Sequence, residues 1–206
     1  MKQLRNLITF RRIGAVLAVT AMFSPVITCA QHNSSLKKDL FLLMMDTMMI
    51  KMDQTPKNVS NDSFFILQMI PHHQGAVSMA EIEISHGKDF TMIQLAKKIL
   101  AEQSVEIQQM KAQLQMLSGD SVPISRDFQK LLRTAMMKMM DNMPEDKGHN
   151  DTDRSFASVM IAHHRAAIDM AMAILKYTKD MHIINFARQI IATEKVEIEQ
   201  MSSFLK

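Results

Sequence analysis

The chain repeats its own pattern at a fixed distance of 91 residues, and this duplication limits the folds that it can adopt. The adjacent pair His72-His73 occurs again as His163-His164, and the flanking methionines and apolar residues correspond without a gap. The correspondence runs from about residue 40 to 110 in one copy and from about 131 to 201 in the other. The duplication predicts two similar structural units related by an approximate two-fold axis, each with its own histidine pair.

The first thirty residues have the pattern of a secretory signal. Basic residues precede the apolar stretch 13–27, which is too short for a typical membrane-spanning helix. We therefore expect residues 1–30 to be a signal peptide and residues 31–206 to form one exported domain in the periplasm or cell envelope. The small residues around Cys29 favour cleavage, and a lipid anchor on Cys29 is the alternative.

The charge and the cysteine content of the exported domain restrict its partners. Loss of the signal removes four basic and no acidic side chains, so the formal net charge changes from +3 to −1. A domain without a surplus of Lys and Arg gives no reason to expect nucleic acid or an anionic membrane as partner. Because Cys29 is the only cysteine, a bound metal must use nitrogen, oxygen or thioether ligands.

Composition and apolar spacing predict an all-α protein. Proline and glycine number five each, tryptophan is absent and methionine reaches 22. The helical period predicts helices at about 36–53, 62–86, 89–117, 126–142, 153–177 and 180–205. Four long helices in two hairpins are typical of a four-helix bundle, to which the Met-rich helices of each half are added. The internal repeats then cover about 36–117 and 126–206.

Each histidine pair shares one predicted helix face with methionine. At about 100° per residue, the histidines and methionines of each copy fall within an arc of roughly 120°. We expect these side chains to face the core as candidate metal ligands: Met69, His72, His73, Met79, Met160, His163, His164 and Met170.

The next helix of each half supplies a carboxylate opposite this face, Glu106 in one copy and Glu197 in the other. An unpaired buried charge is costly, so each glutamate needs a partner. We expect each to accept a hydrogen bond from a histidine ring, which leaves the other ring nitrogen available to a metal.

The ligand types favour copper. Thioether sulfur is a soft ligand that binds Cu(I) or Ag(I) far better than Mg²⁺ or Ca²⁺, and imidazole suits copper and zinc. Further thioethers on the first helix of each half are candidates for auxiliary Cu(I) binding: Met44, Met45, Met48, Met49, Met52, Met136, Met137, Met139, Met140 and Met143. The pattern predicts a copper-binding protein, with Cu(I) favoured and Cu(II) or Ag(I) as alternatives.

The same residues also have a purely structural interpretation. Methionine is a flexible core filler, and a methionine stripe at helical spacing is more often packing than a ligand set. Histidines facing glutamates can form a buried hydrogen-bonded network that sets the register of a bundle. The alternative prediction is a metal-free structural or partner-binding bundle of the cell envelope.

No sequence pattern predicts an enzyme. Di-iron carboxylate bundles use two Glu-x-x-His motifs. Only Glu83 and His86 have that spacing here, and the corresponding residues are Ile174 and Tyr177. We therefore expect Glu83 and His86 to be a pair on the helix surface. A Ser/His/Asp arrangement, a phosphate-binding glycine loop and a nucleophilic cysteine are not evident.

The segment from Met69 to Ala76, followed by Met79-Ala80 and later by Glu106 and Met110, resembles the bacterial domain-of-unknown-function family 305. The resemblance covers most of residues 62–205 and implies a ferritin-like four-helix fold and, often, export. Some relatives of the CopM kind are associated with periplasmic copper binding and resistance. The resemblance therefore implies copper buffering or resistance, with a metal ion and another copper-handling envelope protein as partners.

The two copies of the motif differ beside the histidines. Arg165 in the second copy corresponds to Gln74 in the first. We therefore expect a cation near one of the two candidate sites and unequal metal affinities in the two halves.

Overall fold

The computed structural model describes residues 29–117, 123–144 and 151–206. Except for its last two residues, which begin the first helix, the expected signal peptide 1–30 lies outside the described residues. The helices are α1 (Cys29–Asp53), α2 (Asn61–His86), α3 (Phe90–Met116), α4 (Arg126–Asp141), α5 (Thr152–Ile174) and α6 (Met181–Leu205). The described parts of the chain contain no strand, so the predicted all-α, ferritin-like fold is confirmed.

Side-chain caps explain why the helices begin where they do. Ser60 accepts a hydrogen bond from the backbone N–H of Ser63 at the start of α2, and Asp89 accepts one from Met92 at the start of α3. Asp180 accepts one from Ile183 at the start of α6. Such caps satisfy N–H groups that have no partner inside the helix. None of the described helices is long and apolar enough to cross a membrane.

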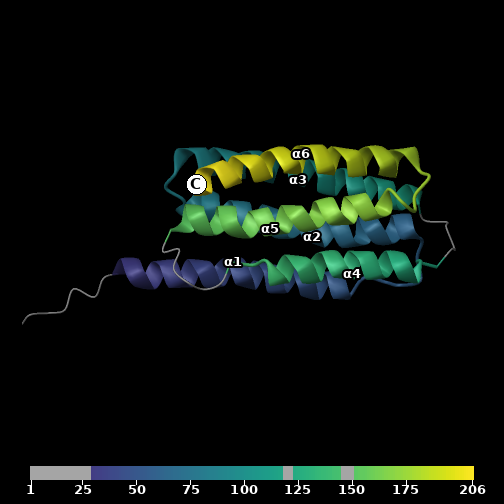
Figure 1. Cartoon of the computed structure of the whole chain (residues 1–206), viewed down its shortest axis with the longest axis horizontal. Coiled ribbons are helices and arrows are strands. Elements are labelled where there is room, and N and C mark those ends of the chain that lie inside the picture. The colour runs from purple at the N-terminus through teal and green to yellow at the C-terminus, as the bar shows by residue number, and fades with distance from the viewer. Residues whose placement is uncertain (1–28, 118–122, 145–150) are drawn as a thin grey trace, which may run out of the picture.

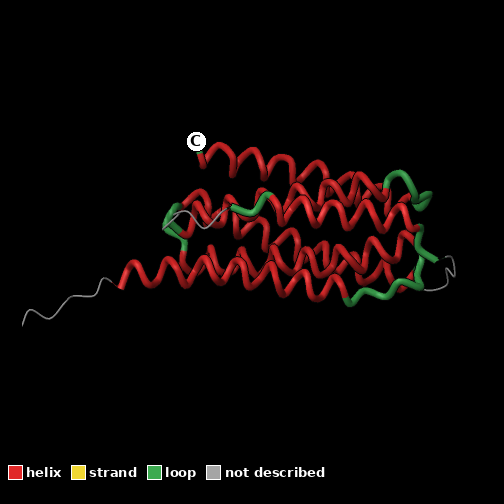
Figure 2. The backbone as a smooth tube through the Cα atoms, turned by 60° about the horizontal axis from the view of Figure 1, so that its bottom comes forward, coloured by secondary structure: helices red, strands yellow, loops and turns green. Residues whose placement is uncertain are grey.

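The helices form three layers of two (Figure 1). The central layer consists of α2 and α5, which pack against each other. On one side α3 packs on α2 and α6 packs on α5, and on the other side α1 packs on α2 and α4 packs on α5. Figure 2 shows the same arrangement after rotation, with all six helices running along the long axis of the molecule. The central pair is therefore covered on both faces.

The first helix of each half adds a third layer to the predicted bundle, and it approaches the central layer closely. A Cβ atom on Gly75 of α2 would lie 3.1 Å from Met48 Sδ of α1. The corresponding residue of α5 is Ala166, which is also buried. Small residues at this position let the Met-rich helices pack directly over the centre of the bundle.

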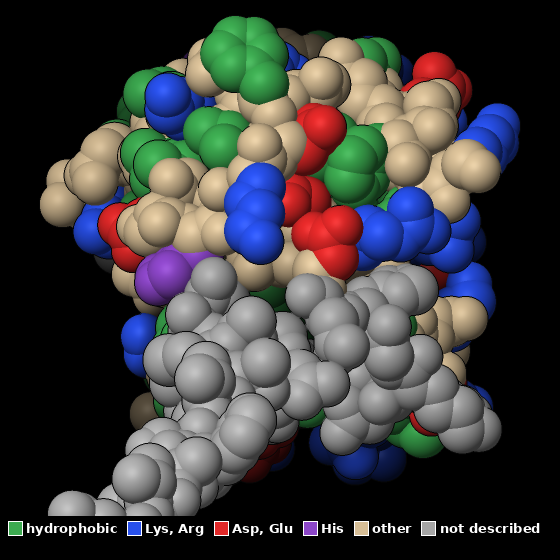
Figure 3. All heavy atoms as spheres, turned by 90° about the vertical axis from the view of Figure 1, so that its left-hand side faces the viewer, with side chains coloured by type: hydrophobic (Ala, Val, Ile, Leu, Met, Phe, Trp, Pro, Cys, Tyr) green, Lys and Arg blue, Asp and Glu red, His purple; other side chains and the backbone are tan. Residues whose placement is uncertain are grey.

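At the end of α2 one expectation was wrong. His86 is exposed as predicted, but Glu83 is fully buried. Burial and the adjacent Asp153 of α5 raise the pKa of Glu83 to about 9. Asp153 accepts hydrogen bonds from the backbone N–H groups of Lys88 and Asp89, and thus holds the α2–α3 turn against α5. Figure 3 views this end of the molecule, where acidic and basic side chains gather on the surface.

Candidate metal centre

The histidine layer, defined here as His72, His73, His163 and His164, lies in the middle of the bundle and is completely buried. All four side chains come from α2 and α5, the central pair of helices. The rings of His72 and His163 are in contact, with their centroids 3.7 Å apart and their planes tilted by 34°. These two residues correspond in the two copies, so their contact is the one that an approximate two-fold axis between the halves would produce.

The hydrogen bonds predicted for the two glutamates are present. His73 Nε2 lies 3.0 Å from Glu106 Oε2, and His164 Nε2 lies 2.9 Å from Glu197 Oε2. His163 Nε2 also donates to a backbone carbonyl, at 3.1 Å. Since a carbonyl can only accept, the proton of His163 is on Nε2 and its Nδ1 carries a lone pair.

Five ring nitrogens of the histidine layer have no hydrogen-bond partner among the described residues. They are both nitrogens of His72 and Nδ1 of His73, His163 and His164. Buried polar atoms are nearly always hydrogen-bonded, because an unpaired one costs about 1–3 kcal/mol. These buried nitrogens therefore call for a partner, and a metal ion bound through imidazole nitrogen is a candidate.

The charge state of the central rings also fits a metal. The pKa values of His72 and His163 lie well below the ordinary value, chiefly because of burial and also because of the neighbouring histidines. Both rings are consequently neutral near pH 7. Only a neutral imidazole has a lone pair to donate, so no proton has to be displaced before these rings can bind a metal.

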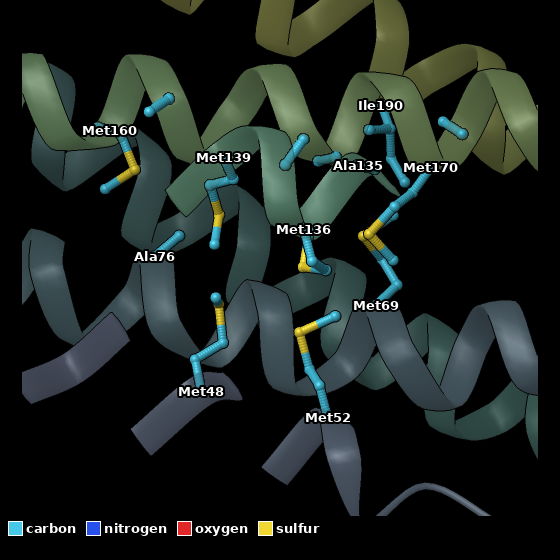
Figure 4. Packing of buried hydrophobic residues seen from close by; sticks show 14 of the residues in the cluster. Met48, Met52, Met69, Ala76, Ala135, Met136, Met139, Met160, Met170 and Ile190 are labelled. Carbon is cyan, nitrogen blue, oxygen red and sulfur yellow. The ribbon is translucent and has the colours of Figure 1, made fainter. Parts of the chain in front are cut away.

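The positions of the other possible ligands make the buried methionines relevant to the candidate site. Within the described residues, no three His, Cys, Asp or Glu side chains are placed so that they could hold one metal ion. A metal bound here without rearrangement has at most two such side chains as ligands, and methionine sulfur is the candidate that could complete the set. All four candidate methionines are fully buried: Met69, Met79, Met160 and Met170. In Figure 4, Met69 of α2 and Met170 of α5 point toward one another, whereas Met160 lies at the other end of the view.

The ten auxiliary methionines are divided between core and surface. Figure 4 shows Met48 pointing toward Met139, and Met52 toward Met136, across the layer of α1 and α4. The buried ones are Met45, Met48, Met52, Met136 and Met139, the partly buried ones are Met44, Met49 and Met143, and the exposed ones are Met137 and Met140. Half of the set thus packs in the core, and the ten do not line one continuous face.

The sequence interpretation missed polar residues that complete the layer. Gln103 Nε2 donates to Glu194 Oε1 at 3.2 Å, between corresponding positions of α3 and α6. Burial, with the nearby Glu197 and Glu106, raises the pKa of Glu194 well above its ordinary value. Both residues are buried on the inner faces of their helices, but the helical period does not indicate that they meet.

Lys98 and Gln189 were also missed. Lys98 Nζ lies 3.1 Å from Glu197 Oε1, and Gln189 Nε2 donates to Glu106 Oε1 at 3.0 Å. The cation expected near one site was assigned to Arg165, but Arg165 is exposed and lines a pocket with Lys138 and Asp169 between α4 and α5. Among the described residues, Lys98 is the cation that contacts a buried glutamate of the layer, and the sequence did not single it out.

Comparison with solved structures places this arrangement among known folds. The crystal structure of a DUF305 fragment from Deinococcus radiodurans is 24% identical in sequence, with a TM-score of 0.52. The match covers 73% of this chain and 98% of that chain. The Ag-bound form of CopM is 29% identical, with a TM-score of 0.54 and coverage of 69% and 93%. The Cu(II)-bound form of CopM is 28% identical, with a TM-score of 0.54 and coverage of 71% and 95%.

Comparison of the sequence assigns the family. No curated protein matches the chain. The family model described as "Domain of unknown function (DUF305)" matches residues 27–114 and 62–205, which together include nearly all of the described helices. The chain therefore belongs to the DUF305 family.

Proposed function

We propose that this protein is an exported, non-enzymatic binding protein that takes up copper in its core and buffers it or contributes to copper resistance in the periplasm. The observation that carries the proposal is the set of five buried imidazole nitrogens without a hydrogen-bond partner among the described residues. These atoms lie in a core that also contains methionine sulfur. Imidazole and thioether together favour a soft cation, and Cu(I) is the physiological ion that suits both.

The two glutamates beside the histidine layer favour the binding of a monovalent or divalent cation there. The methionine sulfurs and the rings of His72 and His163 are neutral, whereas Glu106 and Glu197 are hydrogen-bonded to the rings of His73 and His164. A carboxylate behind a metal-bound imidazole orients the ring and strengthens it as a donor. The Ag-bound and Cu(II)-bound forms of CopM, which is similar in fold, support copper as the cargo.

The burial of the layer favours binding over catalysis. All four histidines are inaccessible to solvent, so the layer offers no surface on which a molecule larger than an ion could be held. An enclosed site suits retention and release of an ion. Oxygen consumption that depends on Cu(I) would argue for a redox enzyme instead.

A competition titration with a Cu(I) chelator tests the proposal. The key variant combines His72→Leu with His163→Leu, which removes three of the five unpartnered nitrogens. Leucine has a similar volume and fills the core with an apolar side chain. The matched control combines His86→Ala with His182→Ala, two exposed histidines outside the layer. We expect tight binding to fall at least about tenfold in the core variant and to persist in the control. Equal affinity in the two variants, with intact helicity, would place the copper elsewhere.

The competing function is a metal-free structural or partner-binding bundle. It is favoured by the hydrogen bonds between His73 and Glu106 and between His164 and Glu197, which could simply set the register of the helices. The melting temperature separates the two functions. A ligand that binds only the folded state must raise the Tm progressively with its concentration. A Tm independent of Cu(I) would favour the structural bundle.

A further inference from the structure

Each buried glutamate beside the histidine layer has a second partner, and the two partners differ in charge. Glu106 Oε1 accepts a hydrogen bond from the neutral amide of Gln189 at 3.0 Å. Glu197 Oε1 accepts one from the ammonium group of Lys98 at 3.1 Å. Residues 98 and 189 are 91 positions apart and so correspond in the two copies. The hydrogen-bond geometry is thus duplicated, but the charge is not.

Lys98 keeps its charge in this position. Burial alone would lower its pKa, but the carboxylates of Glu197 and Glu102 outweigh burial and raise it. The carboxyl group of Glu197 is therefore already in contact with a cation.

Glu106 has different surroundings. It lines a groove of about 340 Å³ between α3 and α6, together with Glu102, Gln189 and Thr193. No lysine or arginine belongs to the lining of this groove. Glu102, which corresponds to the neutral Thr193, lies in this groove with Glu106 and 3.4 Å from Lys98 Nζ, so its carboxyl group borders both sides. The charge that differs in direct contact with a glutamate of the layer is the ammonium group 3.1 Å from Glu197 Oε1.

We propose that Lys98 makes the two halves of the histidine layer unequal, so that the first monovalent metal ion binds on the His73–Glu106 side. The inference rests on the proposed function. A cation beside His73 is attracted by a carboxylate that carries no ammonium group, whereas a cation beside His164 is also repelled by Lys98. The ammonium group acts on this ion through the Glu197 carboxyl group and the His164 ring, and a Coulomb interaction on the order of 1 kcal/mol makes the affinities differ by about tenfold at low ionic strength.

A titration of the purified protein with Ag(I) tests the order of filling. Ag(I) is diamagnetic, so the ring-nitrogen resonances of the four histidines can be followed by NMR. In the wild type we expect the His73 ring to respond first, and the His164 ring at about tenfold higher free Ag(I).

Charge-swap variants then assign the order to Lys98. Lys98→Gln installs the residue found at the corresponding position, Gln189, and should bring the two responses together. Adding Gln189→Lys to that variant should reverse the order. Lys97→Gln removes the same charge from the adjacent exposed lysine and should leave the order unchanged.

Two outcomes overturn the inference alone: His73 and His164 respond together in the wild type, or the order survives in Lys98→Gln. A lack of response from all four rings overturns the proposed function, and the inference falls with it. Because Lys98 is 42% exposed at its side chain, the glutamine variant should keep the fold, which its helical circular dichroism verifies.

Discussion

Replacement of His72 by leucine should stabilise the metal-free protein, whereas the same change at the adjacent His73 should destabilise it. His72 is fully buried, and neither of its ring nitrogens has a hydrogen-bond partner among the described residues. Leucine removes these two desolvated polar atoms and has a similar volume. His73, by contrast, is hydrogen-bonded to Glu106, and leucine there leaves a buried carboxylate with one partner fewer.

The expected magnitudes follow from these contacts. A buried polar group without a partner costs about 1–3 kcal/mol. The contact of the His72 ring with the tilted His163 ring, which leucine loses, is worth about 0.5–1.5 kcal/mol. His72→Leu should therefore raise the free energy of unfolding by about 1–2 kcal/mol, and His73→Leu should lower it by about 2–3 kcal/mol. For a domain of this size, each kcal/mol shifts the Tm by about 2–4 °C.

Urea unfolding with and without Ag(I) measures both effects. Without metal, the order of stability should be His72→Leu, then wild type, then His73→Leu. With increasing Ag(I), the wild type should gain stability progressively, and His72→Leu should gain less because it lacks a ligand. If metal-free His72→Leu is less stable than the wild type, the His72 ring is satisfied in solution, and the argument from unpartnered nitrogens is wrong.

Gly87→Ala should lower the free energy of unfolding by about 1–3 kcal/mol in urea denaturation, because the new Cβ would lie 2.6 Å from the Glu83 carbonyl oxygen, which cannot move aside. Gly75→Ala should cost less, since the closest atom to its Cβ is the flexible Met48 Sδ at 3.1 Å and the next atoms lie at 3.4 Å; a comparable loss for both variants would contradict this reasoning. Glu83 has a folded pKa of about 9, above its ordinary value of 4.5, so its stabilising contribution is complete below pH 4.5 and is lost as the pH rises toward 9. Glu83→Gln should flatten the decline in urea midpoint between pH 5 and pH 9, and an unchanged decline would assign it to other groups. Glu194→Gln should leave the midpoint nearly unchanged at pH 5 and raise it at pH 9, because burial raises the pKa of Glu194 well above its ordinary value; equal effects at both pH values would show that Glu194 is already ionised at pH 5.

Local signals in the sequence were sufficient for the helices and for their inner faces. Caps such as Ser125 and Asp180 act within a few residues of the chain, so the starts of α2 to α6 could be predicted to within one residue, whereas α1 begins at Cys29 and not near residue 36. The end of α5 was less accurate: the helix ends at Ile174 although the prediction extended to 177. Helix ends fray, and no glycine marks this one.

The pairing of histidine with glutamate could also be predicted, because it needs only one hairpin. His73 and Glu106 lie on consecutive helices, α2 and α3, and the helical period places both on inner faces. The duplication then required the same contact between His164 and Glu197. A buried carboxylate and a nearby imidazole are the natural partners in an apolar core.

The sequence by itself determined the helices, the two-copy organisation and the residues of the histidine layer. Only the tertiary structure decided which groups meet across the halves: the contact between the His72 and His163 rings, the burial of Glu83 against Asp153, and the contact of Lys98 with Glu197. The physical reason is that helical periodicity sets the direction of a side chain on its own helix, whereas contacts between the halves depend on how helices far apart in the chain are aligned along their axes. The charge difference between Lys98 and Gln189 is visible in the sequence, but only packing places it beside a candidate metal site.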